Sequence, residues 1–160
     1  MSHEGKVIAI CIAPKGGETM VAVDAVRAIT GKGLEGDRYA NRIGTFSDTP
    51  GTGRQVTLIE AEAIESLARE YDVEINPAES RRNLVTRGLP LNHLVGQEFL
   101  VGSARLRGLR LCEPCNHLET LTRPGVRGGL VHRGGLRADI IEGGIIRTGD
   151  AATTALPTGA

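Results

Sequence analysis

The sequence predicts a mainly β protein with added helices, folded as a single-domain β-barrel with helical elements. Three observations lead to this fold class. Short runs of β-branched residues recur along the chain, turn-forming residues separate them about every ten positions, and one segment repeats its apolar residues at helical spacing. The 160 residues suffice for one domain with a buried core, and they contain no internal repeat.

The first part of the chain predicts two strands and two loops. Residues 5–13 form a β-branched run typical of a strand, and the alternating residues 20–29 predict a second one. Glycines punctuate residues 31–39 and permit positive φ there, but the Gly-Lys-Ser/Thr ending of a P-loop is absent. Residues 41–53 are polar and rich in Gly, Pro and Thr, so we expect a surface loop.

The clearest helix follows a short strand at residues 55–59. Residues 60–71 place five apolar side chains on one helical face: Ala63, Ile64, Leu67, Ala68 and Tyr71. The glutamates of the first turn suit the positive end of the helix dipole. We expect this apolar face to belong to the core and to carry no function.

The remaining elements are expected to be strands joined by turns. The pattern predicts a strand at 81–86, a hairpin of 98–101 with 104–111, and a final hairpin of 138–142 with 144–147. A loop rich in Gly, Arg and His covers 125–137, and residues 151–160 are expected to form a frayed tail.

Composition excludes several classes of function. The 19 Lys and Arg residues balance 19 Asp and Glu residues, which argues against a surface built for nucleic acid or anionic membrane. Aromatic residues make up 2% of the chain and Trp is absent, so base-stacking platforms are not expected. No apolar run reaches the roughly 20 residues that span a bilayer. Without a secretory signal, and with an odd number of cysteines, the chain is expected in the cytoplasm.

Soft and nucleophilic side chains gather in one stretch, Cys112-Glu113-Pro114-Cys115, with His117 close behind. The residues alone leave four readings open: half of a zinc site, a redox pair, a single functional thiolate, or two buried structural cysteines. A zinc site built on these two cysteines would lack a second pair of ligands. A redox pair is typical of a parallel βαβ unit. If one cysteine is functional, Arg110, His117 and the Arg-rich loop would lower its pKa.

A second signal points to an anion. Arg dominates the basic residues from Arg81 onward, and its planar guanidinium suits phosphate or carboxylate. His132 lies between glycine pairs whose backbone N–H groups can approach a ligand closely, as in an anion nest. A thiolate beside arginines and Gly-rich backbone suits a ligand with both a soft metal and a phosphate.

Several motifs in order make the chain familiar: Gly33-Leu34-Glu35-Gly36-Asp37-Arg38, Arg54-Gln55-Val56-Thr57-Leu58-Ile59, Arg82-Asn83-Leu84-Val85-Thr86-Arg87-Gly88-Leu89, Leu94-Val95-Gly96 and Leu111-Cys112-Glu113-Pro114-Cys115. Together they resemble a stand-alone bacterial MOSC domain, the module named for the C-terminal part of molybdenum-cofactor sulfurase. The resemblance runs from about Val7 to Asp150. It implies a MOSC-like β-barrel with flanking helices over residues 1–150, followed by a flexible tail at 151–160.

The resemblance also implies a function. Members of this family bind the molybdenum cofactor or carry sulfur, and some relatives reduce N-hydroxylated compounds. The family's molybdenum-ligating cysteine best matches Cys115, which would act as metal ligand, catalytic thiolate or persulfide site. Arg82 and Asn83 match the strand beside the pterin phosphate, and Asp37 and Arg38 match a Gly-Asp-Arg turn. The cofactor site is therefore expected to include Arg82, Asn83, Asp37, Arg38, Arg54, His132 and Arg133.

The partners expected from this resemblance are cofactor or sulfur-donor proteins and an electron-transfer protein, with no nucleic acid and no membrane. One alternative stays open. In that reading the chain is a non-catalytic interaction module and its cysteines are structural.

Overall fold

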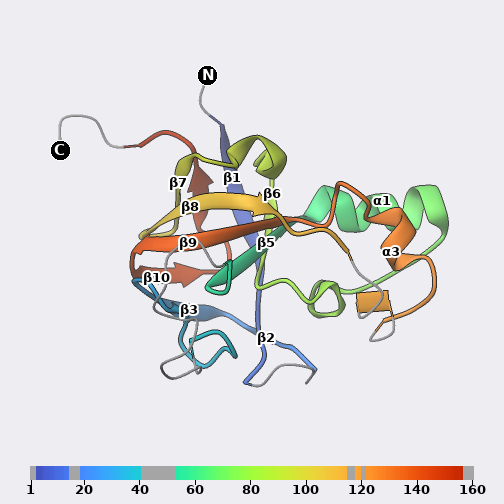
Figure 1. Cartoon of the computed structure of the whole chain (residues 1–160), viewed down its shortest axis with the longest axis horizontal. Coiled ribbons are helices and arrows are strands. Elements are labelled where there is room, and N and C mark those ends of the chain that lie inside the picture. Colours follow the sequence, from blue (N-terminus) through green and yellow to red (C-terminus); the bar gives the residue numbers. More distant parts are fainter. Residues whose placement is uncertain (1–2, 15–18, 41–52, 115–117, 120–121, 157–160) are drawn as a thin grey trace.

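The computed structural model describes residues 3–14, 19–40, 53–114, 118–119 and 122–156. Within them a closed β-barrel carries its helices on one side (Figure 1). The strands are β1 (Glu4–Ile12), β2 (Val21–Val23), β3 (Ala25–Ile29), β4 (Gly33–Leu34), β5 (Val56–Glu60), β6 (Leu84–Arg87), β7 (Glu98–Val101), β8 (Ala104–Leu111), β9 (Leu136–Glu142), β10 (Gly144–Arg147) and β11 (Ala151–Thr153). The helices are α1 (Ala61–Tyr71), α3 (Val126–Gly129) and the 3-10 turns η1 (Pro77–Ser80) and η2 (Leu91–Leu94).

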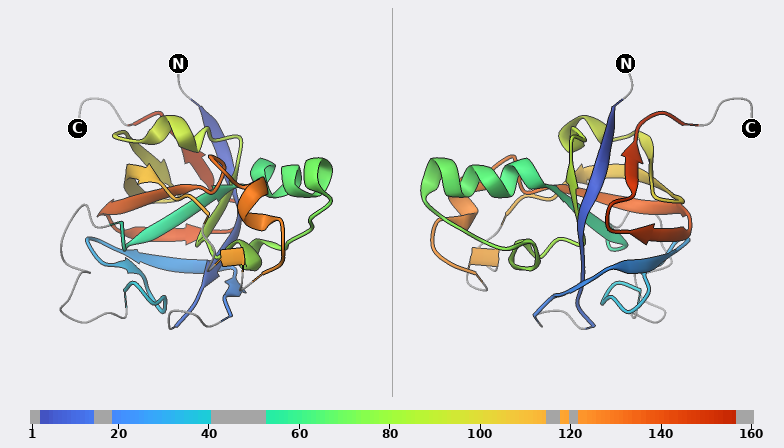
Figure 2. Two further views of the ribbon diagram at one scale, coloured as in Figure 1. Left: turned by 45° about the vertical axis from the view of Figure 1, so that its right-hand side comes forward. Right: turned by 180° about the vertical axis from the view of Figure 1, so that it is seen from behind.

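Seven strands close the barrel in the order β11-β7-β8-β9-β5-β6-β1, and β1 returns to pair with β11. Figure 2 shows this closure from behind, where the blue β1 runs beside the red β11. The β5–β6 pair is parallel and its two strands are joined through α1, whereas the other barrel pairs are antiparallel. The expected fold class, a β-barrel with flanking helices, is confirmed.

Two apolar clusters stabilise this arrangement. The larger fills the barrel with side chains from nearly every barrel strand, and Phe99 is its largest member. The smaller lies under α1, where Leu67 packs with Ile59, Val85 and Leu130. Full burial of a leucine contributes about 2 kcal/mol, so this face anchors the helix. Tyr71, which the periodicity placed on the same core face, is instead 54% exposed at the end of α1. Among the described residues, no helix is long and apolar enough to cross a bilayer.

Two expectations about the C-terminal part are wrong. Strands β9 and β10 do not pair as a hairpin: β9 lies between β8 and β5, whereas β10 pairs with β3 in a second sheet. At their junction a Cβ on Gly143 would lie 2.4 Å from the carbonyl oxygen of Ala28, so the glycine lets the chain turn onto β3. The expected tail also begins too early, because Ala151–Thr153 forms β11 and closes the barrel.

Candidate functional site

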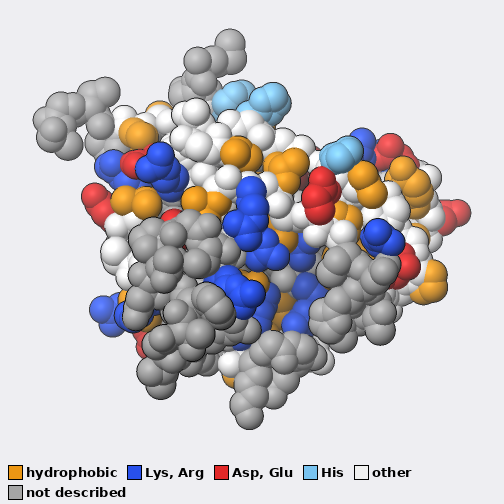
Figure 3. All heavy atoms as spheres, in the orientation of Figure 1, with side chains coloured by type: hydrophobic (Ala, Val, Ile, Leu, Met, Phe, Trp, Pro, Cys, Tyr) orange, Lys and Arg blue, Asp and Glu red, His pale blue; other side chains and the backbone are white. Residues whose placement is uncertain are grey.

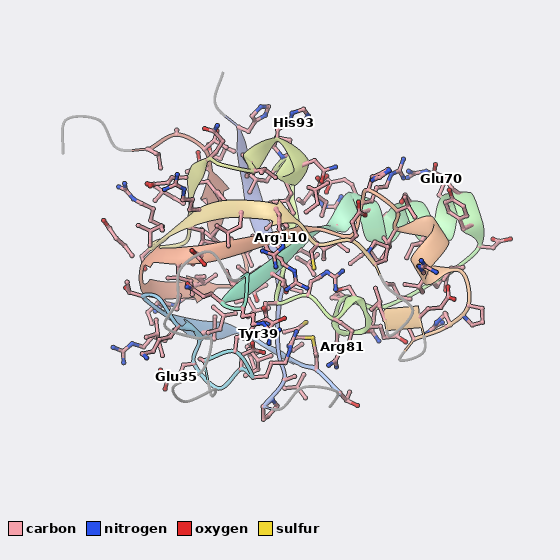
Figure 4. The ribbon with its side chains drawn as sticks, viewed as in Figure 1. Glu35, Tyr39, Glu70, Arg81, His93 and Arg110 are labelled. Carbon is pink, nitrogen blue, oxygen red and sulfur yellow. The ribbon has the colours of Figure 1, made fainter. Side chains whose placement is uncertain are left out.

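Basic side chains gather around a hollow at the centre of one face of the molecule (Figure 3). Figure 4 labels Arg110, Arg81 and Tyr39 in the central part of the same view. Five arginines make up what we call the arginine cluster: Arg38, Arg81, Arg82, Arg110 and Arg137. They come from separate parts of the chain: the turn after β4, the segment between η1 and β6, and strands β8 and β9.

Strands β8 and β9 bring two of these arginines together. Arg110 and Arg137 are cross-strand partners, next to a register shift between Gly108 and Arg110. Both side chains border the backbone of Gly53, where a Cβ would lie 2.8 Å from a guanidinium nitrogen of Arg110 and 2.9 Å from Cδ of Arg137. Arg137 donates to the Gly53 carbonyl oxygen at 3.0 Å. Arg54, the next residue, is exposed at this edge of the cluster.

Arg81 is held in a strained conformation by the short helix before it. A capping box begins η1: the Asn76 side chain accepts the Glu79 backbone N–H at 3.0 Å, and the Glu79 carboxylate accepts the Asn76 N–H at 2.9 Å. The helix ends at Arg81 with φ 62° and ψ 20°, in the left-handed region. For a side chain with a Cβ this conformation costs about 1 kcal/mol, and such strain is often found at functional sites.

A buried carboxylate fixes the turn that carries Arg38 and Tyr39. Asp37 is completely buried and accepts the backbone N–H groups of Ala13 at 2.9 Å and Tyr39 at 3.4 Å. It also accepts a 3.3 Å hydrogen bond from the Arg38 guanidinium. The Arg38 guanidinium carbon in turn lies 4.5 Å from the centroid of the Tyr39 ring. The predicted site residues Asp37 and Arg38 therefore lie together, with the aspartate as the support.

The cluster concentrates positive charge in a small volume. Burial lowers the pKa of Arg81, and the nearby positive charge of Arg38 lowers it further. Burial alone would raise the pKa of Tyr39, but the charges and hydrogen bonds of Arg38 and Arg137 outweigh it and lower that pKa. Both shifts report positive charge crowded into a partly desolvated space. An anion entering this hollow would be stabilised.

Arg82 is buried and uses its guanidinium on the protein itself. Its Nε donates to the carbonyl oxygen of Gly134 at 2.7 Å, one Nη to that of Cys112 at 3.0 Å and the other to that of Ser80 at 3.4 Å. The side chain thus fastens the segment after β8, where the Cys-Glu-Pro-Cys motif begins, to the turn before β9. Arg82 supports the floor of the site.

Asn83, another predicted site residue, is fully buried and joins three strands. Its carbonyl oxygen accepts the backbone N–H of Thr57 at 3.0 Å and the Thr57 hydroxyl at 3.1 Å, and its amide donates to the carbonyl oxygen of Cys11 at 3.1 Å. These bonds tie β1, β5 and the start of β6 below the cluster.

The cysteines fall into two groups. Cys11 and Cys112 are buried free thiols, and burial raises the pKa of Cys11. Cys115 and His117 lie outside the described residues, so the predicted thiolate stays a prediction. Within the described part of the chain, no group of three or more His, Cys, Asp or Glu side chains is placed to hold a metal ion.

The structure brings His132 and Arg133 together on the other side of the turn before β9. His132 has φ 63°, and Glu113 accepts both its backbone N–H at 2.8 Å and a bond from its ring Nδ1 at 2.9 Å. Arg133 pairs with Glu70 of α1 at 2.9 Å. With Glu60 and Asn92, these residues border a separate cavity of about 270 Å³. They clamp the Cys-Glu-Pro segment from outside.

This outer clamp is expected to open in acid. The His132 backbone N–H, followed by its ring, holds the pKa of Glu113 below the usual glutamate value, so the clamp is intact above that usual value and is lost as pH falls through the lowered folded pKa. An NMR pH titration of the His132 amide should give a midpoint below the ordinary glutamate value. Glu113→Ala should remove the transition, whereas Glu74→Ala should not. A midpoint at the ordinary glutamate value would contradict this assignment.

Reasoning from the sequence missed four residues of the hollow: Arg81, Arg110, Arg137 and Tyr39. No local motif marks them. Arg110 was noted only as a neighbour of the cysteines, and its pairing with Arg137 depends on a register that a sequence does not show. The positive φ of Arg81 was equally hidden, although the Asn-Pro-x-Glu sequence before it is a recognisable helix start.

Comparisons with known proteins identify one family by its sequence model and one fold by solved structures. The model of the MOSC domain matches residues 45–153, more than half of the chain. The YuaD protein from Bacillus subtilis superposes with a TM-score of 0.76 at 18% identity, covering 96% of this chain and 96% of that one. YiiM from Geobacillus stearothermophilus gives a TM-score of 0.69 at 13% identity, covering 98% of this chain and 78% of that one. YiiM from Escherichia coli gives 0.62 at 20% identity, covering 100% and 72%. Comparison with curated proteins finds no significant match.

Proposed function

The chain belongs to the MOSC domain family, and on this premise we propose that it binds the molybdenum cofactor, with the phosphate of the pterin in the arginine cluster and Cys115 as the thiolate toward the metal. The same thiolate could instead carry sulfur as a persulfide. The proposed activity is reduction of N-hydroxylated compounds with electrons from a partner protein.

The observation that carries this proposal is the crowding of guanidinium groups around one hollow. Burial and Arg38 both disfavour the charged form of Arg81, whereas Asp37, which accepts two backbone N–H groups, favours it. A phosphate accepts several charge-assisted hydrogen bonds at once, which suits a place where guanidinium groups from several segments converge. The donor set therefore fits the anionic end of the cofactor.

Each part of the site has a separate task in this proposal. Arg38, Arg81, Arg110 and Arg137 bind and orient the anionic end. Arg82 inside and the Glu113–His132 clamp outside hold the segment that leads from Cys112 to Cys115. When bound, the cofactor supplies two-electron redox chemistry, and the protein supplies binding, orientation and electrostatics.

The alternative, an interaction module with structural cysteines, draws support from the burial of Cys11 and Cys112. Those two thiols are placed as small core residues are. The alternative does not explain the arginine cluster, which is why we favour cofactor binding.

Replacing Arg81 tests the proposal, with the protein produced in a host that makes the cofactor. Wild-type protein should retain molybdenum and fluorescent pterin in proportion to protein. Arg81→Asn should weaken pterin retention about ten- to a hundredfold, because a charge-assisted hydrogen bond contributes roughly 1.5–3 kcal/mol. The same variant should melt at a higher temperature when unliganded, because asparagine tolerates the left-handed conformation and removes a crowded charge.

Arg27→Ala is the matched control, since Arg27 is exposed on β3 and should change neither property. Wild-type protein free of molybdenum and pterin, or equal retention in Arg81→Asn, would remove the arginine cluster from the proposed function.

A further inference from the structure

Tyr39 has an unusual position for a tyrosine. It is half-buried, and its phenol interacts electrostatically with Arg38, Arg137 and Arg81 of the arginine cluster. Figure 4 labels it on the face of the molecule that also carries the labels of Arg110 and Arg81. Its backbone is fixed on Asp37, and its ring lies 4.5 Å from the Arg38 guanidinium carbon. Its hydroxyl is hydrogen-bonded by both Arg38 and Arg137. The phenol oxygen therefore occupies a place where guanidinium donors converge.

We infer that the Tyr39 hydroxyl is itself a ligand of the anion bound in the arginine cluster, and that it must keep its proton for the anion to bind. This inference rests on the cluster being an anion site, but it does not depend on which anionic molecule binds there. A neutral phenol can donate one hydrogen bond to a phosphate or sulfate oxygen, whereas a phenolate can only accept. In the phenolate form, Tyr39 would be an internal anion that competes for the same guanidinium donors.

The charged groups that face Tyr39 set the direction of this effect. Arg38 and Asp37 lie on its own turn, Arg137 comes from β9, and Arg81 comes from the segment after η1. The arginines stay charged across the accessible pH range. They lower the pKa of Tyr39 despite its burial, so the phenolate forms at a lower pH than in an exposed tyrosine.

The sign of the pH dependence follows from linkage. A bound dianion disfavours a second negative charge nearby and raises the pKa of Tyr39 above its value in the free site. Binding therefore takes up a proton between the two pKa values, and the affinity falls as pH rises through the lower one. One titrating group limits the loss to about tenfold per pH unit.

The chain offers a direct test because it contains only two tyrosines. The other one, Tyr71, lies exposed on α1. In Tyr71→Phe, the ultraviolet absorbance of tyrosinate reports Tyr39 alone, and in Tyr39→Phe it reports Tyr71 alone. Sulfate is the probe, since it remains a dianion throughout the titration, and chloride keeps the ionic strength constant.

Three results are expected. Tyr39 should titrate below the ordinary value of a tyrosine, and sulfate should raise its midpoint. By calorimetry, the dissociation constant for sulfate should rise by up to about tenfold per pH unit above the Tyr39 midpoint in Tyr71→Phe. In Tyr39→Phe, sulfate should bind more weakly at neutral pH, and its affinity should no longer depend on pH in this way.

The inference is overturned if sulfate does not bind, if it leaves the Tyr39 titration unchanged, or if Tyr39→Phe keeps the full pH dependence. These outcomes are independent of molybdenum and pterin. If the protein retains the cofactor but sulfate does not affect the titration of Tyr39, only this inference is rejected. If sulfate does affect the titration of Tyr39 but the protein retains no cofactor, only the proposed cofactor is rejected.

Discussion

Cys115→Ser is expected to abolish retention of molybdenum and of any persulfide sulfur while leaving the barrel folded. A thiolate is a soft ligand that binds molybdenum and sulfur, whereas a serine hydroxyl stays protonated near neutral pH and is a poor substitute. The measurement is the molar ratio of metal, pterin and cyanide-releasable sulfur to protein, with circular dichroism as the check of folding.

Cys11→Ala is the matched control for this experiment. Cys11 is buried in a small apolar cluster with Ala13 and Met20, so its replacement should leave metal and sulfur content unchanged. A Cys115→Ser protein that retains its cofactor in full would eliminate the proposed thiolate. The structural reading of the cysteines would be favoured if the wild type contains no cofactor and Cys115→Ser only loses stability.

Arg82→Ala is expected to lower the free energy of unfolding by about 3 kcal/mol. The buried guanidinium donates to the carbonyl oxygens of Gly134, Cys112 and Ser80. Removing it leaves these carbonyl oxygens without that donor, and hydrogen bonds to a charged group contribute roughly 1.5–3 kcal/mol each before any relaxation. Urea unfolding measures the change, which should appear in the midpoint without a change in slope.

Two further variants separate support from direct ligation. Arg82→Lys keeps the charge but loses the planar fork, so it should recover only part of the stability. The exposed Arg27→Ala should lie within about 0.5 kcal/mol of the wild type. If Arg82 contacted the phosphate directly, as the family resemblance implies, Arg82→Ala would lose cofactor while its unfolding free energy stayed the same. That result would contradict the supporting role.

The sequence was most informative where a local pattern decides the structure. The apolar spacing in residues 60–71 predicted α1, and the Gly102-Ser103 turn between two strand-like runs predicted the β7–β8 hairpin. The same reasoning from turn residues wrongly predicted a hairpin at Glu142-Gly143-Gly144. There the glycine lets the chain pass close to β3, and nothing local shows that a distant strand is available.

The residues of the candidate site also fall into those that a local sequence pattern marked and those that it did not. The Gly-Asp-Arg turn and the Arg-Asn start of β6 were identified from the sequence, and Asp37, Arg82 and Asn83 hold the frame of the site. The anion-facing residues were largely missed. Arg110 and Arg137 meet through strand register, and Arg81 occupies a strained cap.

By itself, the sequence determined the mainly β class, the helix, most strands and the family, because these follow from periodicity, turn residues and ordered motifs within short windows. Only the tertiary structure decided that β11 closes the barrel, that β10 leaves β9 for β3, and that Arg38 and Arg137 from distant segments both act on Tyr39. The physical reason is that charge crowding and desolvation depend on distances between residues far apart in the chain. No local pattern encodes those distances.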